Sequence, residues 1–272
     1  MFNIPWGTFD EVHISTLVGV VFINLVLFLI LRKLTRKKQI LILFLLSFAG
    51  IANIAYNIWS SHSLYENLPL NFWSLNAIIL PFAVLFRPKW ACNLSLFWSL
   101  GSYFALIFNM NRASMDVFSV AFVFFYAAHL VGIGIPILLF ELELVEKDFR
   151  TMKYTISFTL LAYTLAHIIN VAINSAEVLG PTGEIIKVNY FSSIAPTDKI
   201  LSFFYAIVNS PYWYMFLTIP VFILYMVWWY LPELLDYRRR TAGLRRKLKA
   251  IDKYYDEYKE EYIDEIIEEK YL

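Results

Sequence analysis

The sequence predicts an all-α membrane protein: a polytopic helical bundle of seven transmembrane helices, followed by a charged cytoplasmic helix. Two observations lead to this fold class. The 272 residues are 59% hydrophobic and 17% charged, whereas a soluble domain is about half apolar and about a quarter charged. The charged residues are also clustered, and the stretches between the clusters approach the ~20 residues that a helix needs to cross a bilayer.

The charge-poor stretches define the spans in chain order. Residues 12–31, 155–176 and 200–232 contain no Asp, Glu, Lys or Arg. Residues 40–86 contain only one such residue and residues 90–140 only two, so each of these stretches is read as two spans separated by a break. The seven predicted spans are approximately 12–31, 40–59, 68–86, 91–109, 117–140, 155–174 and 212–231.

The orientation follows from the basic residues in the loops. The first span is not read as a removable signal peptide, because Asp10 and Glu11 precede it and its basic cluster follows the apolar run. One set of alternate loops carries ten Lys and Arg residues, and the other carries three. Because cytoplasmic loops are enriched in these residues, we expect the N-terminus outside, the C-terminus in the cytoplasm, and residence in the plasma membrane.

The predicted external loop 175–211 is long for a helical bundle. The turn sequence Gly180-Pro181-Thr182-Gly183 favours a short hairpin. Residues 199–208 are predicted to form a short helix, capped by Thr197 or Asp198. This helix is too short to span the membrane, so we interpret it as an interfacial helix or re-entrant lid; a broken eighth span is the alternative.

The segment 236–272 is predicted to form an amphipathic cytoplasmic helix. Its first part carries seven basic residues positioned for anionic phosphates at the membrane surface, namely Arg238, Arg239, Arg240, Arg245, Arg246, Lys247 and Lys249. Residues 250–272 carry nine acidic and three basic residues. Coiled-coil spacing places apolar or aromatic residues in one stripe, at Leu244, Leu248, Ile251, Tyr255, Tyr258 and Tyr262. The helix is therefore a candidate for binding a cytoplasmic protein or a second copy; a solvated helix and a disordered tail are the alternatives.

Polar side chains inside the spans are the main functional candidates, because they are costly at membrane depth. Eight of them are predicted to lie between the midplane and the outer surface: Asn53, Asn57, Asn71, Asn76, His129, His167, Asn170 and Asn174. We interpret them as one outward-facing polar cavity for a lipid head group or another small amphiphile. The alternative is that these residues bridge neighbouring helices in pairs.

Other site types fit the sequence poorly. Two histidines in the spans without nearby carboxylates do not make a zinc site, and the last span has no lysine for a Schiff base. The single cysteine, Cys92, excludes a disulfide framework. The net charge of +1 argues against nucleic-acid binding. We expect no metal and no cofactor, and the nucleophile left for an enzyme is Ser74, with His129 or His167 as base.

Four stretches together resemble one family. The run LPLNFWSLNAIILPFAVLFRPKW (Leu68–Trp90) is similar to the signature of the YwaF-type bacterial membrane proteins, relatives of transmembrane protein 164. FYAAHLVGIGIPILLF (Phe125–Phe140) resembles a second family helix and places His129 on its histidine. Val188–Phe191 resembles the Asn-Tyr element of the outer loop, and Ala195–Tyr214 resembles the short helix before the last span.

The resemblance implies a bundle of about six or seven spans. It also implies phospholipid acyl transfer, because the eukaryotic relative is regarded as an acyltransferase that uses a cysteine and a histidine. In the family pattern LPLHxC, however, the histidine falls on Asn71 and the cysteine on Trp73. Asparagine does not titrate and tryptophan has no nucleophilic atom. The sequence therefore favours a divergent, non-catalytic member that binds a lipid; lipid acyl transfer or hydrolysis, and small-solute transport, are the alternatives.

Overall fold

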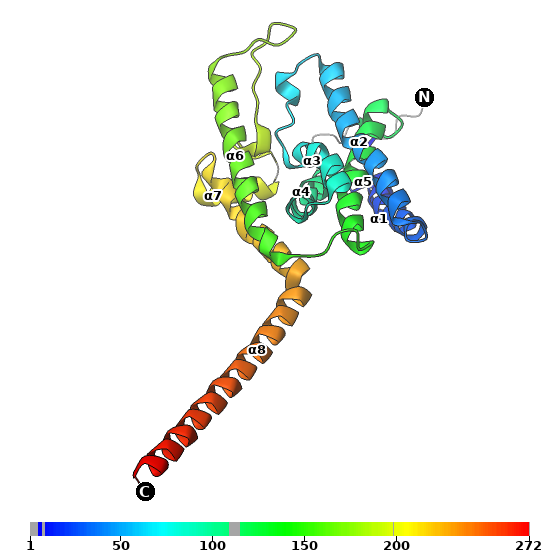
Figure 1. Ribbon diagram of the computed structural model, residues 1–272. Coiled ribbons are helices and arrows are strands. Elements are labelled where there is room, and N and C mark those ends of the chain that lie inside the picture. Colours follow the sequence, from blue (N-terminus) through cyan, green and yellow to red (C-terminus); the bar gives the residue numbers. More distant parts are fainter. Residues whose placement is uncertain (1–4, 7–8, 109–114, 198, 272) are drawn as a thin grey trace. The chain divides into compact units, whose positions relative to one another are not determined.

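The computed structural model describes residues 5–6, 9–108, 115–197 and 199–271 (Figure 1). The chain divides into two compact units, Met1–Met226 and Val227–Leu272. The elements in chain order are β1 (Pro5–Trp6), α1 (Glu11–Leu31), α2 (Arg36–Ser61), η1 (Tyr65–Asn67), α3 (Phe72–Phe86), α4 (Lys89–Phe108), β2 (Met115–Asp116), α5 (Val120–Glu141), η3 (Phe149–Thr151), α6 (Met152–Ser175), η4 (Tyr190–Ser192), α7 (Lys199–Val208), η5 (Trp213–Leu217) and α8 (Thr218–Tyr271).

The fold is helical, as the composition predicts. The described strands are the antiparallel pair β1 and β2, of two residues each, with Pro5 opposite Asp116. A single antiparallel bridge between Leu179 and Ile185 also closes the hairpin predicted around Gly180–Gly183. Helix α7 (Lys199–Val208) lies where the sequence predicts a short helix; of its two predicted caps, Asp198 is outside the described residues.

Among the described residues, five helical segments are long and apolar enough to cross a membrane: Glu11–Leu31, Arg36–Ser61, Val120–Glu141, Phe149–Ser175 and Trp213–Asp256. The predicted spans 68–86 and 91–109 correspond to α3 and α4, which are not among the five. Helix α3 is apolar but has only 15 residues, about 22 Å at 1.5 Å per residue. It is shorter than predicted because it begins at Phe72, after the N-cap Asn71. Seven spans and their orientation stay predictions.

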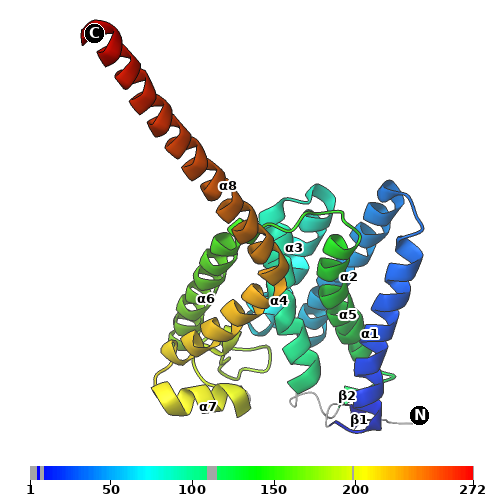
Figure 2. The ribbon, with the colours of Figure 1, turned by 90° about the horizontal axis from the view of Figure 1, so that it is seen from below.

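In the first unit, α2 to α5 form the centre, with α1 on one side and α6 on the other (Figures 1 and 2). Gly50 of α2 allows a close approach to α3, because a Cβ added at Gly50 would lie 2.5 Å from the Ala77 Cβ. Asn76 of α3 joins two further helices: its amide donates to the Gly132 carbonyl oxygen of α5 at 3.1 Å and accepts from the Ser95 hydroxyl of α4 at 2.6 Å.

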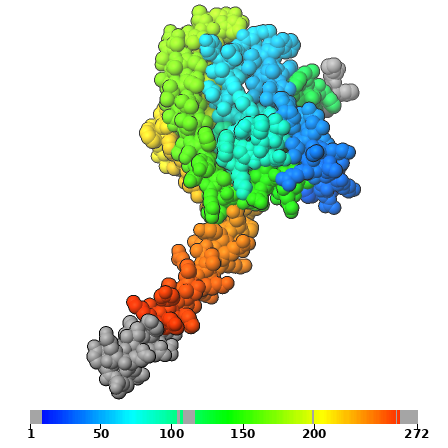
Figure 3. All heavy atoms as spheres, in the orientation of Figure 1, coloured from blue at the N-terminus to red at the C-terminus, as the bar shows by residue number. Residues whose placement is uncertain are grey.

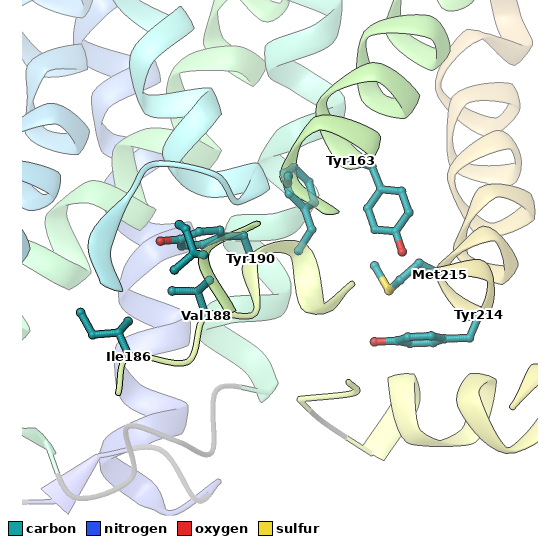
Figure 4. Close-up of a cluster of buried hydrophobic side chains, with 9 residues drawn as sticks. Tyr163, Ile186, Val188, Tyr190, Tyr214 and Met215 are labelled. Atoms are coloured by element: carbon teal, nitrogen blue, oxygen red, sulfur yellow. The ribbon is translucent and has the colours of Figure 1, made fainter. Parts of the chain in front are cut away.

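A separate apolar cluster packs α6 against η5 and against the segment 175–211, which we call the long loop. Tyr163 of α6 packs there with Val188 and Tyr190 of the long loop and with Tyr214 and Met215 of η5 (Figure 4). These side chains are buried. The long loop is therefore part of the packed core of this unit.

The second unit is the continuation of α8 from Val227, a single helix (Figure 1), and its coloured atoms form a narrow rod (Figure 3). Pro232 lies inside it, where proline cannot donate the usual backbone hydrogen bond. The seven basic residues predicted for the membrane surface are all exposed: Arg238, Arg239, Arg240, Arg245, Arg246, Lys247 and Lys249. Arg240 Nη2 forms an ion pair with Asp236 Oδ2 one turn away, at 2.7 Å.

The α2–α3 crossing is tested by adding one methyl group. We expect Gly50→Ala to reduce the free energy of unfolding by about 1–3 kcal/mol, because the methyl overlaps Ala77. Gly243→Ala is the control, since nothing lies within 4 Å of a Cβ there; alanine's helix propensity should leave stability unchanged or slightly raised. Thermal unfolding of both variants in detergent measures the difference. Equal stability of the two variants would contradict the close crossing.

Candidate functional site

Two asparagines on α6 hold the long loop through paired hydrogen bonds. Asn170 Oδ1 accepts from the Tyr190 N–H at 2.9 Å, and Asn170 Nδ2 donates to the Tyr190 carbonyl oxygen at 2.8 Å. Asn174 repeats this arrangement with Val188, with both distances 2.8 Å. Each side-chain amide thus pairs with a backbone N–H and C=O as a neighbouring β-strand would.

The spacing of the partners explains how both amides are satisfied. Asn170 and Asn174 are four residues apart, about 6.0 Å along the helix axis. Their partners Tyr190 and Val188 are two residues apart and follow in the opposite order. The segment 188–190 therefore runs antiparallel to α6 and meets both amides at once. Burial raises the pKa of the Tyr190 phenol to about 12, consistent with close packing of this segment.

His167 and Ser193 extend the same row of contacts. The His167 Nδ1 atom is 3.0 Å from Ser193 Oγ, and Asn170 Nδ2 donates to the same oxygen at 2.8 Å. Ser193 is fully buried, and Phe191 and Ser192 before it have positive φ angles. Ser193 was not predicted from the sequence, because a single serine in a loop has no pattern that marks it as functional. Its place beside His167 follows only from the pairing of Val188 and Tyr190 with Asn174 and Asn170.

The Ser193–His167 contact resembles a nucleophile with its base, but the surrounding amides are already used. Acyl transfer needs hydrogen-bond donors directed at the developing oxyanion. The Ser193 N–H donates to the Tyr190 carbonyl oxygen, and the Ile194 and Ala195 N–H groups donate to Asn189 Oδ1. We call the hydrogen bonds of His167, Asn170 and Asn174 to residues 188–193 the clasp. The clasp holds the loop on α6.

The two residues that the resemblance aligns with the family's cysteine and histidine also have contacts within the fold. Asn71 Oδ1 accepts from the Phe191 N–H at 2.8 Å, so it holds the loop from the α3 side. Trp73 lies beside His129, with the two ring centroids 5.4 Å apart. His129 is buried, its Nδ1 is 2.7 Å from the Phe125 carbonyl oxygen, and its ring also contacts the Phe125 ring.

The predicted nucleophile Ser74 caps α3. Its hydroxyl accepts from the Asn71 N–H at 3.1 Å and is 3.0 Å from the Asn71 carbonyl oxygen, to which it donates. The described hydrogen bonds of His129 and His167 go to Phe125 and Ser193. The structure therefore assigns Ser74 a capping contact where the sequence predicts a Ser–His pair as the catalytic alternative.

The eight predicted cavity residues thus separate into groups. Asn71, His167, Asn170 and Asn174 bind the loop. Asn76 joins three helices, His129 packs against aromatic rings, and Asn57 is half-buried. Asn53 is 1% exposed, and neither of its amide atoms has a hydrogen-bond partner in the described structure.

Two hollows of the first unit lie elsewhere, and none of the eight residues lines either of them. The smaller, about 50 Å³, lies between α6 and the segment 215–226, against Phe72. The larger is a groove of about 290 Å³ between α1, α4 and α5, which we call the α1–α5 groove. Its lining is mostly apolar and consists of Val20, Val21, Asn24, Leu25, Phe28, Tyr103, Ile133, Gly134, Ile137, Leu138 and Glu141.

An amide and a carboxylate, those of Asn24 and Glu141, lie in the lining of the α1–α5 groove. Asn24 Nδ2 donates to the Val20 carbonyl oxygen at 2.9 Å, and its Oδ1 lies where a Cβ on Gly134 would be, 1.6 Å away. Glu141 ends α5, and its Oε1 is 3.9 Å from Lys147 Nζ. Over the described part of the chain, no group of three or more His, Cys, Asp or Glu side chains could hold a metal ion.

The clasp is tested by removing one amide. We expect Asn170→Ala to leave the buried Tyr190 N–H without a partner, at a cost of about 1–3 kcal/mol, while the Tyr190 carbonyl oxygen keeps the Ser193 N–H as a donor. Hydrogen exchange of residues 186–193 should accelerate as the segment detaches from α6. Asn57→Ala serves as the control, because Asn57 lies on α2 away from the loop contacts. Unchanged exchange in Asn170→Ala would contradict the clasp.

Comparisons with known proteins agree with the helical membrane architecture. The sequence profile of the TMEM164 family matches residues 8–230. Searches of curated proteins and of solved structures found no match. The profile covers four of the five candidate membrane spans and the first part of the fifth, Trp213–Asp256, and the chain therefore belongs to the TMEM164 family.

Proposed function

We propose that this multi-pass membrane protein binds a membrane lipid in the α1–α5 groove. The single observation that carries the proposal is the groove itself: about 290 Å³, lined mainly by apolar side chains of two candidate membrane spans. This volume lies at the lower end of the roughly 300–1,000 Å³ of small-molecule pockets. The lipid is the partner, and no metal, cofactor or nucleic acid takes part.

The shape of the groove suits one acyl chain. Its lining residues run over Val20–Phe28 on α1 and 133–141 on α5, in each case about 12 Å of helix. Helix α1 buries few of its own side chains, namely His13, Val20 and Leu31. Because most side chains of α1 are not covered by the rest of the unit, a lipid chain can lie against them in the groove beside α5.

The polar residues give the ligand a direction. The Glu141 carboxylate and the Lys147 ammonium lie 3.9 Å apart at one end of the groove. Opposite charges at this spacing suit a zwitterionic head group, with its cation on Glu141 and its phosphate on Lys147. Asn24 lies on α1 farther from this end of the groove. The acyl chain would occupy the apolar stretch between Asn24 and Glu141. With the predicted orientation, the head group would lie at the cytoplasmic side of the plasma membrane.

The proposal assigns no catalytic step. Asn71 and Trp73 occupy the family's histidine and cysteine positions, and their contacts are with the loop and with His129. The predicted head-group cavity formed by the eight polar residues is a separate hypothesis. The hydrogen bonds of four of them to the loop support a structural role for those four.

Filling the groove tests the proposal. We expect Val21→Trp and Leu25→Trp to reduce the amount of phospholipid that co-purifies with the protein severalfold, because the indole occupies the space of the chain. Val18→Trp is the matched control: Val18 and Val21 are 61% and 67% exposed on α1, but only Val21 lines the groove. Mass spectrometry of lipids extracted from the purified proteins measures the amount. Equal lipid content in all three variants would contradict the proposal.

A further inference from the structure

The tail of α8, by which we mean residues 236–271, carries a stripe of apolar and aromatic side chains that no other described element of its unit covers. The exposed fractions of Leu244, Leu248, Ile251, Tyr255 and Tyr258 are 59–71%. Their spacing alternates between four and three residues, which places them on one side of the helix as in a coiled coil. A stripe of this kind is stabilised when a second helix covers it.

The charges of the tail indicate the direction of that second helix. Residues 238–249 carry seven basic and no acidic residues, and residues 257–268 carry six acidic residues and one basic residue. A parallel pair in register would bring each block against the same block. An antiparallel pair brings the basic block of one helix beside the acidic block of the other.

The apolar stripe has the same antiparallel symmetry. Pairing about Lys253 places Leu248 opposite Tyr258 and Ile251 opposite Tyr255, so each aliphatic side chain meets a tyrosine. The same alignment places residues 238–249 opposite 257–268. Stripe and charge therefore select one register.

Pro232 removes one backbone hydrogen bond between the membrane span and the tail, which provides a place for the tail to bend.

We propose that the tail of α8 pairs antiparallel with the tail of a second copy of this chain, through the stripe 244–258. The partner is a second copy because the chain itself supplies both complementary blocks in the matching register. Copies held in one membrane meet at high effective concentration, so a short pairing segment suffices. This self-association is independent of the proposed lipid site.

Charge reversal tests the partner. One full-length variant carries Arg245→Glu, Arg246→Glu and Lys249→Glu; the other carries Glu257→Lys, Glu260→Lys and Glu261→Lys, which face those three positions in the proposed register. Light scattering in detergent should find the wild type dimeric, each variant alone monomeric, and an equal mixture of the two dimeric again. A monomeric wild type, or variants that each still dimerise, would overturn the proposal.

Cross-linking in membranes tests the direction. Two differently tagged copies, one with Leu248→Cys and the other with Tyr258→Cys, should form a mixed disulfide on mild oxidation. Cys92 is buried and is kept. Leu248→Cys expressed alone is the control and should form at least tenfold less cross-linked dimer. Stronger cross-linking of Leu248→Cys with itself would indicate a parallel pair, and no tail-dependent cross-link would indicate no pair; either result overturns the proposal.

Discussion

A polar group enclosed in apolar surroundings must find its hydrogen-bond partner inside the protein, and the first unit depends on this constraint. Side-chain amides meet it at several points. Asn76 joins α3 to α4 and α5, and Asn170 and Asn174 bind the backbone of the long loop. Without the last two, the Val188 and Tyr190 N–H groups would lose the hydrogen bonds that hold this segment on α6.

The clasp is built from residues that resemble a reaction centre. His167 and Asn170 are each within hydrogen-bond distance of Ser193, but the N–H groups around Ser193 are already bonded. Asn71, which the resemblance aligns with the family's histidine, accepts a hydrogen bond from the same loop. The loop thus rests on α3 and α6 together. The proposed lipid site is therefore the α1–α5 groove, away from this cluster.

The sequence predicts the helical membrane class because charge is expensive in lipid and its absence is easy to read. It also places His167, Asn170 and Asn174 on one face of a helix, and α6 has them there. Their partners could not be predicted, because these are backbone atoms of Val188 and Tyr190, or a serine that resembles any other. The α1–α5 groove could not be predicted either, since an apolar groove has the same composition as a packed apolar core.

The central claim is that the α1–α5 groove holds a lipid, and a structure determined in a lipid bilayer tests it most directly. A cryo-electron microscopy map of the full chain in phospholipid nanodiscs should show elongated density between α1 and α5, along Leu25 and Ile137, with a head group near Glu141. A map in which α1 packs against α5 with the groove closed and empty would contradict the account.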